Sequence, residues 1–270
     1  HVIYGVVHLK THSKICLVVR QESDGIRRYM HLGTGNYNPF TSKIYTDLGL
    51  LTSNHEIGED ATHVFNYLTG YSNKCEFNHL LVAPVSLRSG LETLIEREIE
   101  HARQGRPSGM IFKVNSVADQ KVITKLYEAS TAGVRQDLIV RGICCLRPGV
   151  EGVSEKIRVR SIIGRFLEHS RIYYFENGGN PEIYCGSADL MERNLSRRVE
   201  ILFPVIDQEI LDHLKQNLDL MLSDNTLAFN LQQDGSYRRI SKKAQDPEIN
   251  SQIKLLEWQV SLIAQGLDIF

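Results

Sequence analysis

Two short stretches of this 270-residue sequence carry nearly the same polar residues in the same order. The first, "THSKICLVV", contains His12 and Lys14, and the second, "EHSRIYYFE", contains His169 and Arg171. Each stretch therefore places a histidine two residues before a long cationic side chain. Because residues i and i+2 of a β-strand point to the same side, each stretch presents a nucleophile or proton carrier beside a positive charge.

A small glycine-containing loop follows each stretch at a similar distance. "GTGN" (33–36) begins 21 residues after His12, and "GSAD" (186–189) begins 17 residues after His169. Glycine lets backbone approach a ligand closely, and exposed N–H groups beside a small hydroxyl suit phosphate oxygens. Each half of the chain thus offers a histidine, a cation and an oxyanion-binding loop.

Each of these features also has a non-catalytic explanation. A single histidine in a strand is most often a structural or surface residue, and a lone Gly-x-Gly loop is a weak signal. Two ordered sets of the same three features are much less expected by chance. A zinc site is disfavoured, since the five cysteines show no Cys-x-x-Cys spacing and no predicted helix carries His-x-x-x-His.

Composition bounds the class of protein. The chain is 42% hydrophobic and 23% charged, with a formal net charge of −1. These values are typical of a globular protein and indicate no general attraction to nucleic acid. The odd cysteine count favours a reducing compartment, and neither a signal peptide nor an apolar run of about 20 residues is present. We expect a cytoplasmic protein, with peripheral membrane association left open.

The pattern along the chain predicts an α/β protein. After apolar strands at 1–7, 14–19 and 26–33 and a helix over 58–71, helical patterns at 89–105 and 118–133 alternate with strands at 110–115, 137–142, 170–176 and 182–187. Ser89 and Glu92 form a possible capping box. Residues 144–168 are predicted as a long loop, and the chain after residue 206 as mainly helical. We predict two domains, 1–82 and 83–270. The apolar start, without an initiator methionine, indicates a C-terminal piece of a longer chain.

These residues carry a family resemblance. The twofold His-x-Lys plus Gly-Ser/Thr-x-Asn pattern resembles the phospholipase D superfamily. The longer strings "HLGTGNYNPFTSKIYTDLGLLT", "GVRQDLIVRGICCLRPG", "RFLEHSRIYYFENGG" and "GSADLMERNLSRRVE" closely resemble the bacterial long-chain type of polyphosphate kinase. The resemblance spans essentially all 270 residues. It implies layered phospholipase D-like α/β domains, each a mixed sheet flanked by helices, with the first domain partial and the second complete.

The resemblance also implies an activity, reversible transfer of the ATP terminal phosphate to polyphosphate through a phosphohistidine. His12 matches the nucleophile, Lys14 and Arg171 the phosphate-binding cations, and His169 the second motif histidine, at the nucleotide and in proton transfer. Tyr45 and Arg141 match the ATP-binding set. Asn36 is a candidate for orienting the phosphohistidine, and Arg193 and Asn194 are weaker candidates. ATP with Mg²⁺, polyphosphate and a homo-oligomer are implied, with no metal ligand assigned in this chain.

Departures from the superfamily pattern leave alternatives open. The Asp expected seven residues after each motif histidine is Val19 in the first copy and Glu176 in the second, and Asp189 replaces the motif Asn. These changes disfavour a phosphodiesterase or nuclease, which remains the enzyme alternative. An inactive polyphosphate- or nucleotide-binding module is the non-enzyme alternative. Residues 135–171 hold eight Lys or Arg against four Asp or Glu. This basic stretch is either a solvated face or part of a channel for a polyanion.

Overall fold

The computed structural model describes residues 1–71, 76–242 and 245–264. The strands are β1 (Lys10–Thr11), β2 (Lys14–Glu22), β3 (Gly25–Gly33), β4 (Tyr45–Thr46), β5 (Gly49–Thr52), β6 (Leu81–Ala83), β7 (Gly109–Val114), β8 (Arg135–Val140), β9 (Ile157–Ile162), β10 (Leu167–Glu168), β11 (Arg171–Phe175), β12 (Glu182–Gly186), β13 (Arg198–Val205), β14 (Ala228–Leu231) and β15 (Tyr237–Arg239). The α-helices are α1 (His55–Leu68), α2 (Leu87–Arg103), α3 (Gln120–Thr131), α4 (Glu192–Ser196), α5 (Gln208–Ser223) and α6 (Ser251–Ala264).

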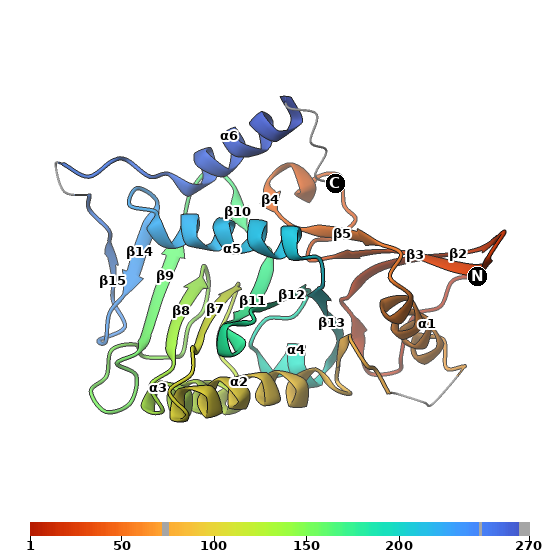
Figure 1. The fold of residues 1–270 in the computed structure, drawn as a ribbon, viewed down its shortest axis with the longest axis horizontal. Helices are drawn as coiled ribbons and strands as arrows, with labels where there is room; N and C mark the ends of the chain where they lie inside the picture. Colours follow the sequence, from red (N-terminus) through yellow and green to blue (C-terminus); the bar gives the residue numbers. More distant parts are fainter. Residues whose placement is uncertain (72–75, 243–244, 265–270) are drawn as a thin grey trace.

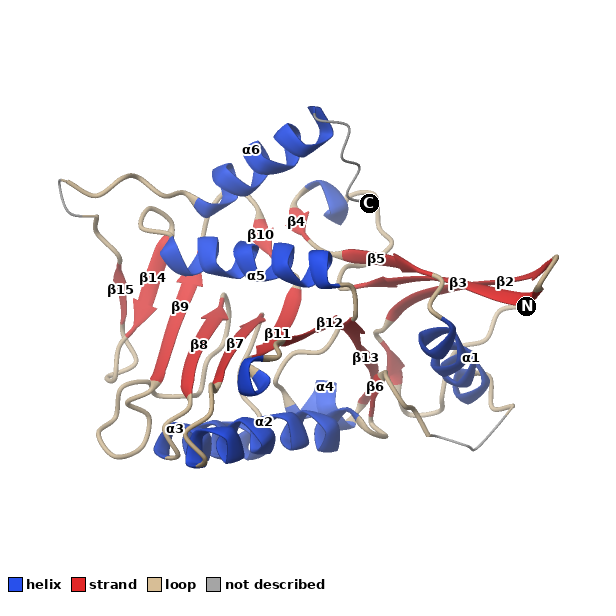
Figure 2. Ribbon diagram, viewed as in Figure 1, coloured by secondary structure: helices blue, strands red, loops and turns tan. Residues whose placement is uncertain are grey.

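One ten-stranded mixed sheet organises the chain. Its order is β1-β13-β12-β11-β7-β8-β9-β14-β15, with β6 also paired to β13. β7, β8 and β9 are parallel, because α3 carries the chain back between β7 and β8. β11, β12 and β13 add antiparallel neighbours. Helices cover both faces of these strands (Figures 1 and 2), so the predicted α/β class, a mixed sheet flanked by helices, is confirmed.

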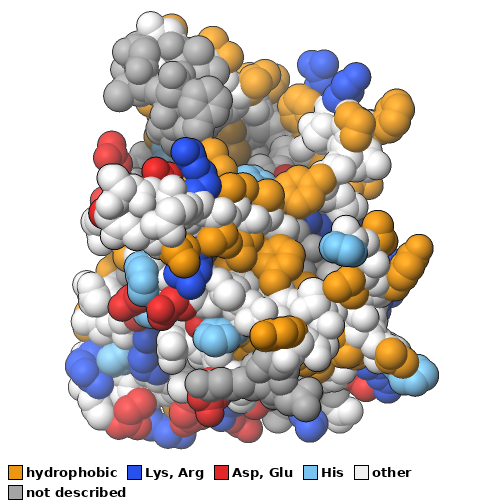
Figure 3. Space-filling view, turned by 90° about the vertical axis from the view of Figure 1, so that its right-hand side faces the viewer, with side chains coloured by type: hydrophobic (Ala, Val, Ile, Leu, Met, Phe, Trp, Pro, Cys, Tyr) orange, Lys and Arg blue, Asp and Glu red, His pale blue; other side chains and the backbone are white. Residues whose placement is uncertain are grey.

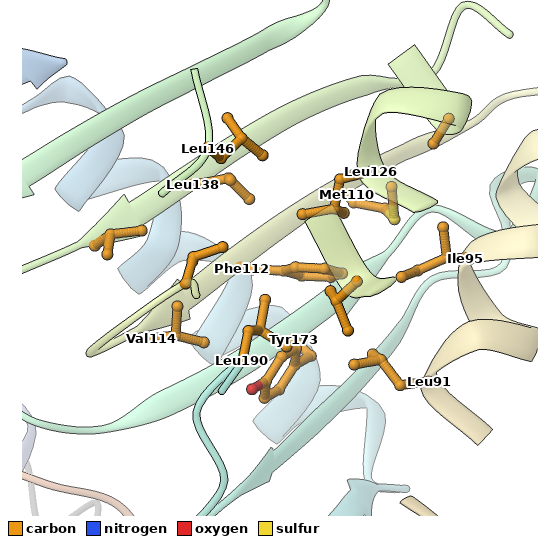
Figure 4. Packing of buried hydrophobic residues seen from close by; sticks show 14 of the residues in the cluster. Leu91, Ile95, Met110, Phe112, Val114, Leu126, Leu138, Leu146, Tyr173 and Leu190 are labelled. Atoms are coloured by element: carbon orange, nitrogen blue, oxygen red, sulfur yellow. The ribbon is translucent and has the colours of Figure 1, made fainter. Parts of the chain in front are cut away.

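The two faces of the sheet build two hydrophobic clusters. Alternate residues of β7 point to opposite sides, so Phe112 joins the cluster under α2 and α3 while Ile111 joins the cluster under α5. In the first cluster Phe112 and Tyr173 pack with ring centroids 5.1 Å apart, and Leu91, Ile95 and Leu126 of the helices close over them (Figure 4). This packing fixes the strand ends from which the polar residues emerge.

Two small sheets accompany the large one, and the second of them joins the two halves of the sequence. β2, β3 and β5 form an antiparallel sheet in which Lys14 lies opposite Gly33. β4 and β10 pair in parallel, with Tyr45 opposite Leu167 and Thr46 opposite Glu168. Residues more than 120 positions apart in the sequence therefore lie side by side.

The β2–β3–β5 sheet leaves one face open. Val18 and Leu51 are 48% and 63% exposed, and hydrophobic side chains are visible over this side of the molecule (Figure 3). In the described part of the chain, β2 pairs only with β3, so its other edge has no strand beside it. An apolar face next to a long edge strand is a surface that a further protein segment can cover.

Several expectations about single elements were wrong. Residues 1–7 form no strand, and Val2 and Tyr4 are 80% and 96% exposed, because no strand of the described residues lies alongside to pair with them. Ser89 caps no helix end. α2 begins at Leu87, and the Ser89 hydroxyl donates to the Ser86 carbonyl within its first turn.

The second half holds more strands than its sequence predicted. The expected loop over 144–168 contains β9 and β10, since "IRVRSI" alternates apolar and polar residues and pairs with β8 and β14. The region after 206, expected to be mainly helical, also contains β14 and β15.

Candidate active site

Both motif histidines are held by the same backbone pattern. In the first copy, the N–H groups of His12 and of the residue after it both donate to the Val199 carbonyl, at 2.9 and 3.0 Å. In the second copy, the N–H groups of His169 and of the next residue both donate to the Thr46 carbonyl, at 3.2 and 2.9 Å. The repeated phrase in the sequence is therefore a repeated local structure.

A carboxylate follows each of these carbonyl residues and binds the histidine ring. Glu200 Oε2 lies 2.8 Å from His12 Nδ1, and Asp47 Oδ1 lies 2.8 Å from His169 Nδ1. Each carboxylate comes from the opposite half of the sequence. A carboxylate at Nδ1 favours the tautomer with Nδ1–H as donor, which leaves the Nε2 lone pair free for nucleophilic attack or proton transfer.

The two glycine-containing loops also repeat each other. Thr34 donates its N–H to the Leu48 carbonyl at 2.9 Å, and its hydroxyl accepts from Leu48 N–H at 2.9 Å. Ser187 makes the same exchange with Ile201, at 3.0 and 3.2 Å. These backbone N–H groups and hydroxyls are thus already engaged within the protein. The expectation that they face phosphate oxygens is wrong for Thr34 and Ser187.

Gly35 has a different role from the one its loop suggested. A Cβ atom at this position would lie 2.2 Å from Asp47 Oδ2. Glycine therefore makes room for the carboxylate that holds His169, and not for a ligand. Asn36 is exposed beside it, and no hydrogen bond joins its side chain to His12 among the described residues.

Lys14 and Arg171 each lie beside the histidine of their own motif. Arg171 binds Asp189 with two hydrogen bonds of 3.2 and 3.1 Å, and its Nη1 lies 3.2 Å from His169 Nε2. Lys14 donates to the His12 carbonyl. Burial lowers the pKa of Lys14 to about 8, an effect that nearby Glu200 opposes and Arg171 reinforces. Arg171 Nη1 also donates to the Thr34 carbonyl at 3.5 Å, and Thr34 follows Gly33, the strand partner of Lys14, so the cations of both motifs lie in one cluster.

The expected nucleotide residues border the His169 side of this cluster. The Tyr45 ring lies against His169, with ring centroids 4.7 Å apart. Arg141 follows β8, where α/β proteins commonly bind ligands, and its Nε donates to Asn115 Oδ1 at 2.6 Å. Burial lowers the pKa of Arg141. Burial also lowers the pKa of His169, although the Asp47 hydrogen bond opposes this shift, so neutral imidazole is favoured.

Sequence reasoning missed the two carboxylates. Glu200 is fully buried within the apolar strand "VEILF", where an unpaired charge would be costly, and this was the available signal. Asp47 had no local signal, because its partner lies 122 residues away. Asn194 donates to Glu200 Oε1 at 2.6 Å, so it reaches His12 only through that carboxylate. Arg193 is exposed on α4.

The basic stretch of the second half is divided in space. Arg158 donates to Asp137 Oδ1 at 2.7 Å, and Arg160 donates to the Met221 carbonyl at 3.2 Å, both on the β8–β9 part of the sheet. Arg141 and Arg171 alone of the eight contact the residues around His169 described above. The stretch is therefore not one continuous lining of the site.

Within ranges 1–71, 76–242 and 245–264, no group of three His, Cys, Asp or Glu could hold a metal ion. No helix in the same ranges has the length and hydrophobicity to cross a bilayer.

Comparisons with known proteins agree with this geometry. The family described as Polyphosphate kinase C-terminal domain 1 matches residues 1–74, and Polyphosphate kinase C-terminal domain 2 matches residues 80–252. The polyphosphate kinase of Thermosynechococcus vestitus is 59% identical over 88% of this chain and 33% of its own length. That of Parasynechococcus marenigrum is 56% identical over 95% of this chain and 36% of its own length.

A solved structure extends the comparison to three dimensions. The crystal structure of polyphosphate kinase from Porphyromonas gingivalis matches with a TM-score of 0.89 and 36% identity, over 94% of this chain and 39% of that one. The chain thus spans about a third of the length of the curated relatives it matches. On these matches the chain belongs to the polyphosphate kinase family.

Proposed function

We propose that this chain carries the phosphoryl-transfer site of an ATP–polyphosphate phosphotransferase. The observation that supports it most is the crossed pair of dyads, in which each motif histidine is held by a carboxylate from the other half. Two histidines, each beside a cation, suit a group that carries several negative charges and moves between two partners.

His12 is the proposed nucleophile. Its Nε2 attacks the terminal phosphorus of ATP, the Nε2–P bond forms, and the bond from phosphorus to the bridging oxygen breaks to release ADP. A terminal oxygen of polyphosphate then attacks the same phosphorus, which frees His12 and lengthens the polymer by one unit. The reverse sequence makes ATP. Glu200 keeps the ring oriented and stabilises positive charge that develops on it.

The remaining residues serve the phosphate oxygens and the nucleotide. Lys14 and Arg171 neutralise charge on the equatorial oxygens, Arg171 through Nη1, because its Nε and Nη2 are bonded to Asp189. His169, kept neutral and held by Asp47, exchanges a proton with the leaving oxygen. Tyr45 and Arg141 contact the nucleotide. Asn36, exposed at the loop, is the residue free to approach the phosphorylated ring.

Mg²⁺ has no fitting site among these carboxylates. Glu200 binds His12, Asp47 binds His169, and Asp189 binds Arg171. Each is committed to a cationic or N–H partner, whereas Mg²⁺ requires free oxygen ligands. We therefore propose that Mg²⁺ arrives with the substrate, as MgATP.

The larger protein is part of the proposal. Since the relatives are about three times longer, we propose that this chain is a C-terminal portion with domains 1–82 and 83–270. The open face of the β2–β3–β5 sheet is where further residues or a second subunit of a homo-oligomer would pack. We propose a cytoplasmic location. ATP, ADP and polyphosphate are the proposed partners, with no role for nucleic acid.

The test is transfer from γ-labelled ATP. Label should appear on the protein and then in polymer, and unlabelled polyphosphate with ADP should yield ATP. Cleavage of a DNA or lipid phosphodiester without transfer would replace this proposal by the nuclease alternative. If the protein extended to the length of its relatives bound polyphosphate but transferred no phosphate, the inactive binding module would be the better explanation.

Arg141→Ala should impair ATP use far more than folding. Arg141 is half-buried and makes one hydrogen bond, to Asn115, whereas a charge-assisted bond to phosphate is worth about 1.5–3 kcal/mol. Since about 1.4 kcal/mol corresponds to a factor of ten, the apparent KM for ATP should rise roughly 10- to 150-fold. Tyr45→Ala should act in the same direction. Steady-state kinetics would measure this, with Arg103→Ala on α2 as the exposed control. Unchanged ATP kinetics in both variants would place the nucleotide elsewhere.

Lys14 should give the reaction an alkaline limit. Its pKa of about 8 lies below the ordinary value of 10.5, so the cation is present below pH 8 and is lost above it. The kcat/KM for ATP should therefore fall above pH 8 with a single ionisation. Lys14→Arg should remove this limit, because arginine stays protonated. A wild-type profile that is flat to pH 9.5 would contradict the assignment.

Protein stability should respond to Lys14 in the opposite direction. Between pH 8 and 10.5 the unfolded lysine keeps the proton that the folded one has lost. The unfolded state then binds more protons, so this residue's contribution to the free energy of unfolding rises with pH in that window.

A further inference from the structure

A buried polar network lies directly behind the His169–Asp47 dyad. We propose that Glu168, fixed by Lys113 and by Gln252 of α6, positions this dyad for phosphoryl transfer. The proposal rests on the function proposed above and adds three positioning residues to it, none of which touches the reacting atoms. It also makes α6 part of the active-site framework.

Both carboxylate oxygens of Glu168 have polar partners. Its Oε2 lies 3.1 Å from Lys113 Nζ and accepts from the Thr46 hydroxyl at 3.0 Å, and its Oε1 accepts from Gln252 Nε2 at 2.7 Å. Lys113 also donates to the Ser170 hydroxyl at 2.7 Å. The Glu168 and Lys113 side chains are only 3% and 2% exposed, so neither can exchange its partner for water.

Strand geometry connects this network to the dyad. Thr46 and Glu168 are opposite each other in the parallel β4–β10 pair, and both point to the network. The residues that directly follow the two strands, Asp47 and His169, make the 2.8 Å contact at the active site. β4 and β10 have only two residues each, fewer than strands usually have. A ladder this short needs side-chain bonds to hold its register.

Gln252 extends the clamp to α6. Its amide accepts from Phe166 N–H at 3.1 Å and donates to the Phe166 carbonyl at 2.9 Å, besides its bond to Glu168. A Cβ at Gly164 would lie 2.5 Å from Gln252 Oε1, so glycine there admits the amide. One side chain of α6 therefore fixes the segment that leads into His169.

A cavity lies beside this amide. Glu168 and Gln252 line a largely apolar cavity of about 470 Å³ between α5, α6 and the back of the β4–β10 pair. A shortened side chain at position 252 would enlarge that cavity instead of being replaced by a neighbour. The position of Glu168 should then be less restricted, and with it the position of Asp47 and His169.

Gln252 gives the cleanest test, because it is neutral. Changing Lys113 or Glu168 alone leaves an unpaired buried charge and endangers folding, whereas Gln252→Ala leaves that ion pair intact. The matched control is Gln259→Ala, on the same helix and cavity but bonded to His213. Protein extended to the length of its relatives should be assayed well below its unfolding temperature, with kcat expressed per folded molecule.

Gln252→Ala should lower kcat for transfer from ATP about tenfold with the KM for ATP nearly unchanged, the pattern of a lost transition-state alignment. Gln259→Ala should match the wild type. A purely structural role would lower the folded fraction alone and leave kcat per folded molecule unchanged, which would overturn the proposal.

An NMR titration of His169 gives a readout independent of activity. Asp47 raises the pKa of His169, while burial, Arg171 and Arg141 lower it. If Gln252→Ala loosens Asp47, the pKa of His169 should fall measurably, and an unchanged titration would contradict the positioning role. Because this measurement needs no turnover, it stands even if transfer from ATP itself is not observed, a result that would count against the proposed function alone.

Discussion

His12→Ala should abolish phosphorylation of the protein by γ-labelled ATP. His12 is the histidine beside Lys14, and Glu200 holds its Nδ1 so that Nε2 is available to attack. Among the described residues of this cluster, His169 is the other histidine with a carboxylate at Nδ1. Its Nε2, however, lies 3.2 Å from Arg171 Nη1. The wild-type label should be acid-labile and base-stable, as expected for a phosphorus–nitrogen bond.

The matched control for His12→Ala is His8→Ala, an exposed histidine four residues earlier, which should label normally. Glu200→Gln adds a graded test. It keeps the shape of the side chain but removes the charge that favours the correct tautomer, so labelling should slow by about 10²- to 10⁴-fold. Full labelling of His12→Ala would assign the phosphate to another residue, with His169 the first to examine.

The sequence allowed the α/β class and both histidine motifs to be predicted, because these depend on local patterns. Periodicity located α1, α2 and α3. The i, i+2 rule did not apply as expected, because His12 and His169 lie just before β2 and β11 and not within a strand. Periodicity failed where a neighbouring strand decides whether a segment becomes a strand. Residues 1–7 are as apolar as a buried strand, but no described strand pairs with them.

The carboxylates could not be predicted for a related reason. Glu200 lies 188 residues from His12, and Asp47 lies 122 from His169, so no spacing motif connects them. The loop glycines were misread because Gly35 is required by the Asp47 side chain and not by a ligand. In both cases a tertiary contact, invisible in the local sequence, determines the residue type.

Two arginine–aspartate pairs have similar geometry and different burial, so their loss should change the free energy of unfolding by very different amounts. Arg171 binds Asp189 with its side chain 4% exposed, and Arg158 binds Asp137 with its side chain 62% exposed. Removing one partner of a buried pair typically costs about 3–5 kcal/mol, whereas an exposed pair is worth about 0.2–1 kcal/mol. Urea denaturation should therefore find Arg171→Ala strongly destabilised and Arg158→Ala nearly wild type.

Activity should separate the two arginines further. Arg171 lies 3.2 Å from His169 Nε2, where a transferring phosphate would need positive charge, so even the folded fraction of Arg171→Ala should transfer phosphate at least 10²-fold more slowly. Arg171→Lys keeps the charge but loses the two-pronged bond to Asp189, and should recover part of the stability and little of the rate. Arg158→Ala should transfer normally. If the exposed and buried variants lost equal activity per folded molecule, Arg171 would be a structural residue, and the positive charge at the centre of the site would rest on Lys14 alone.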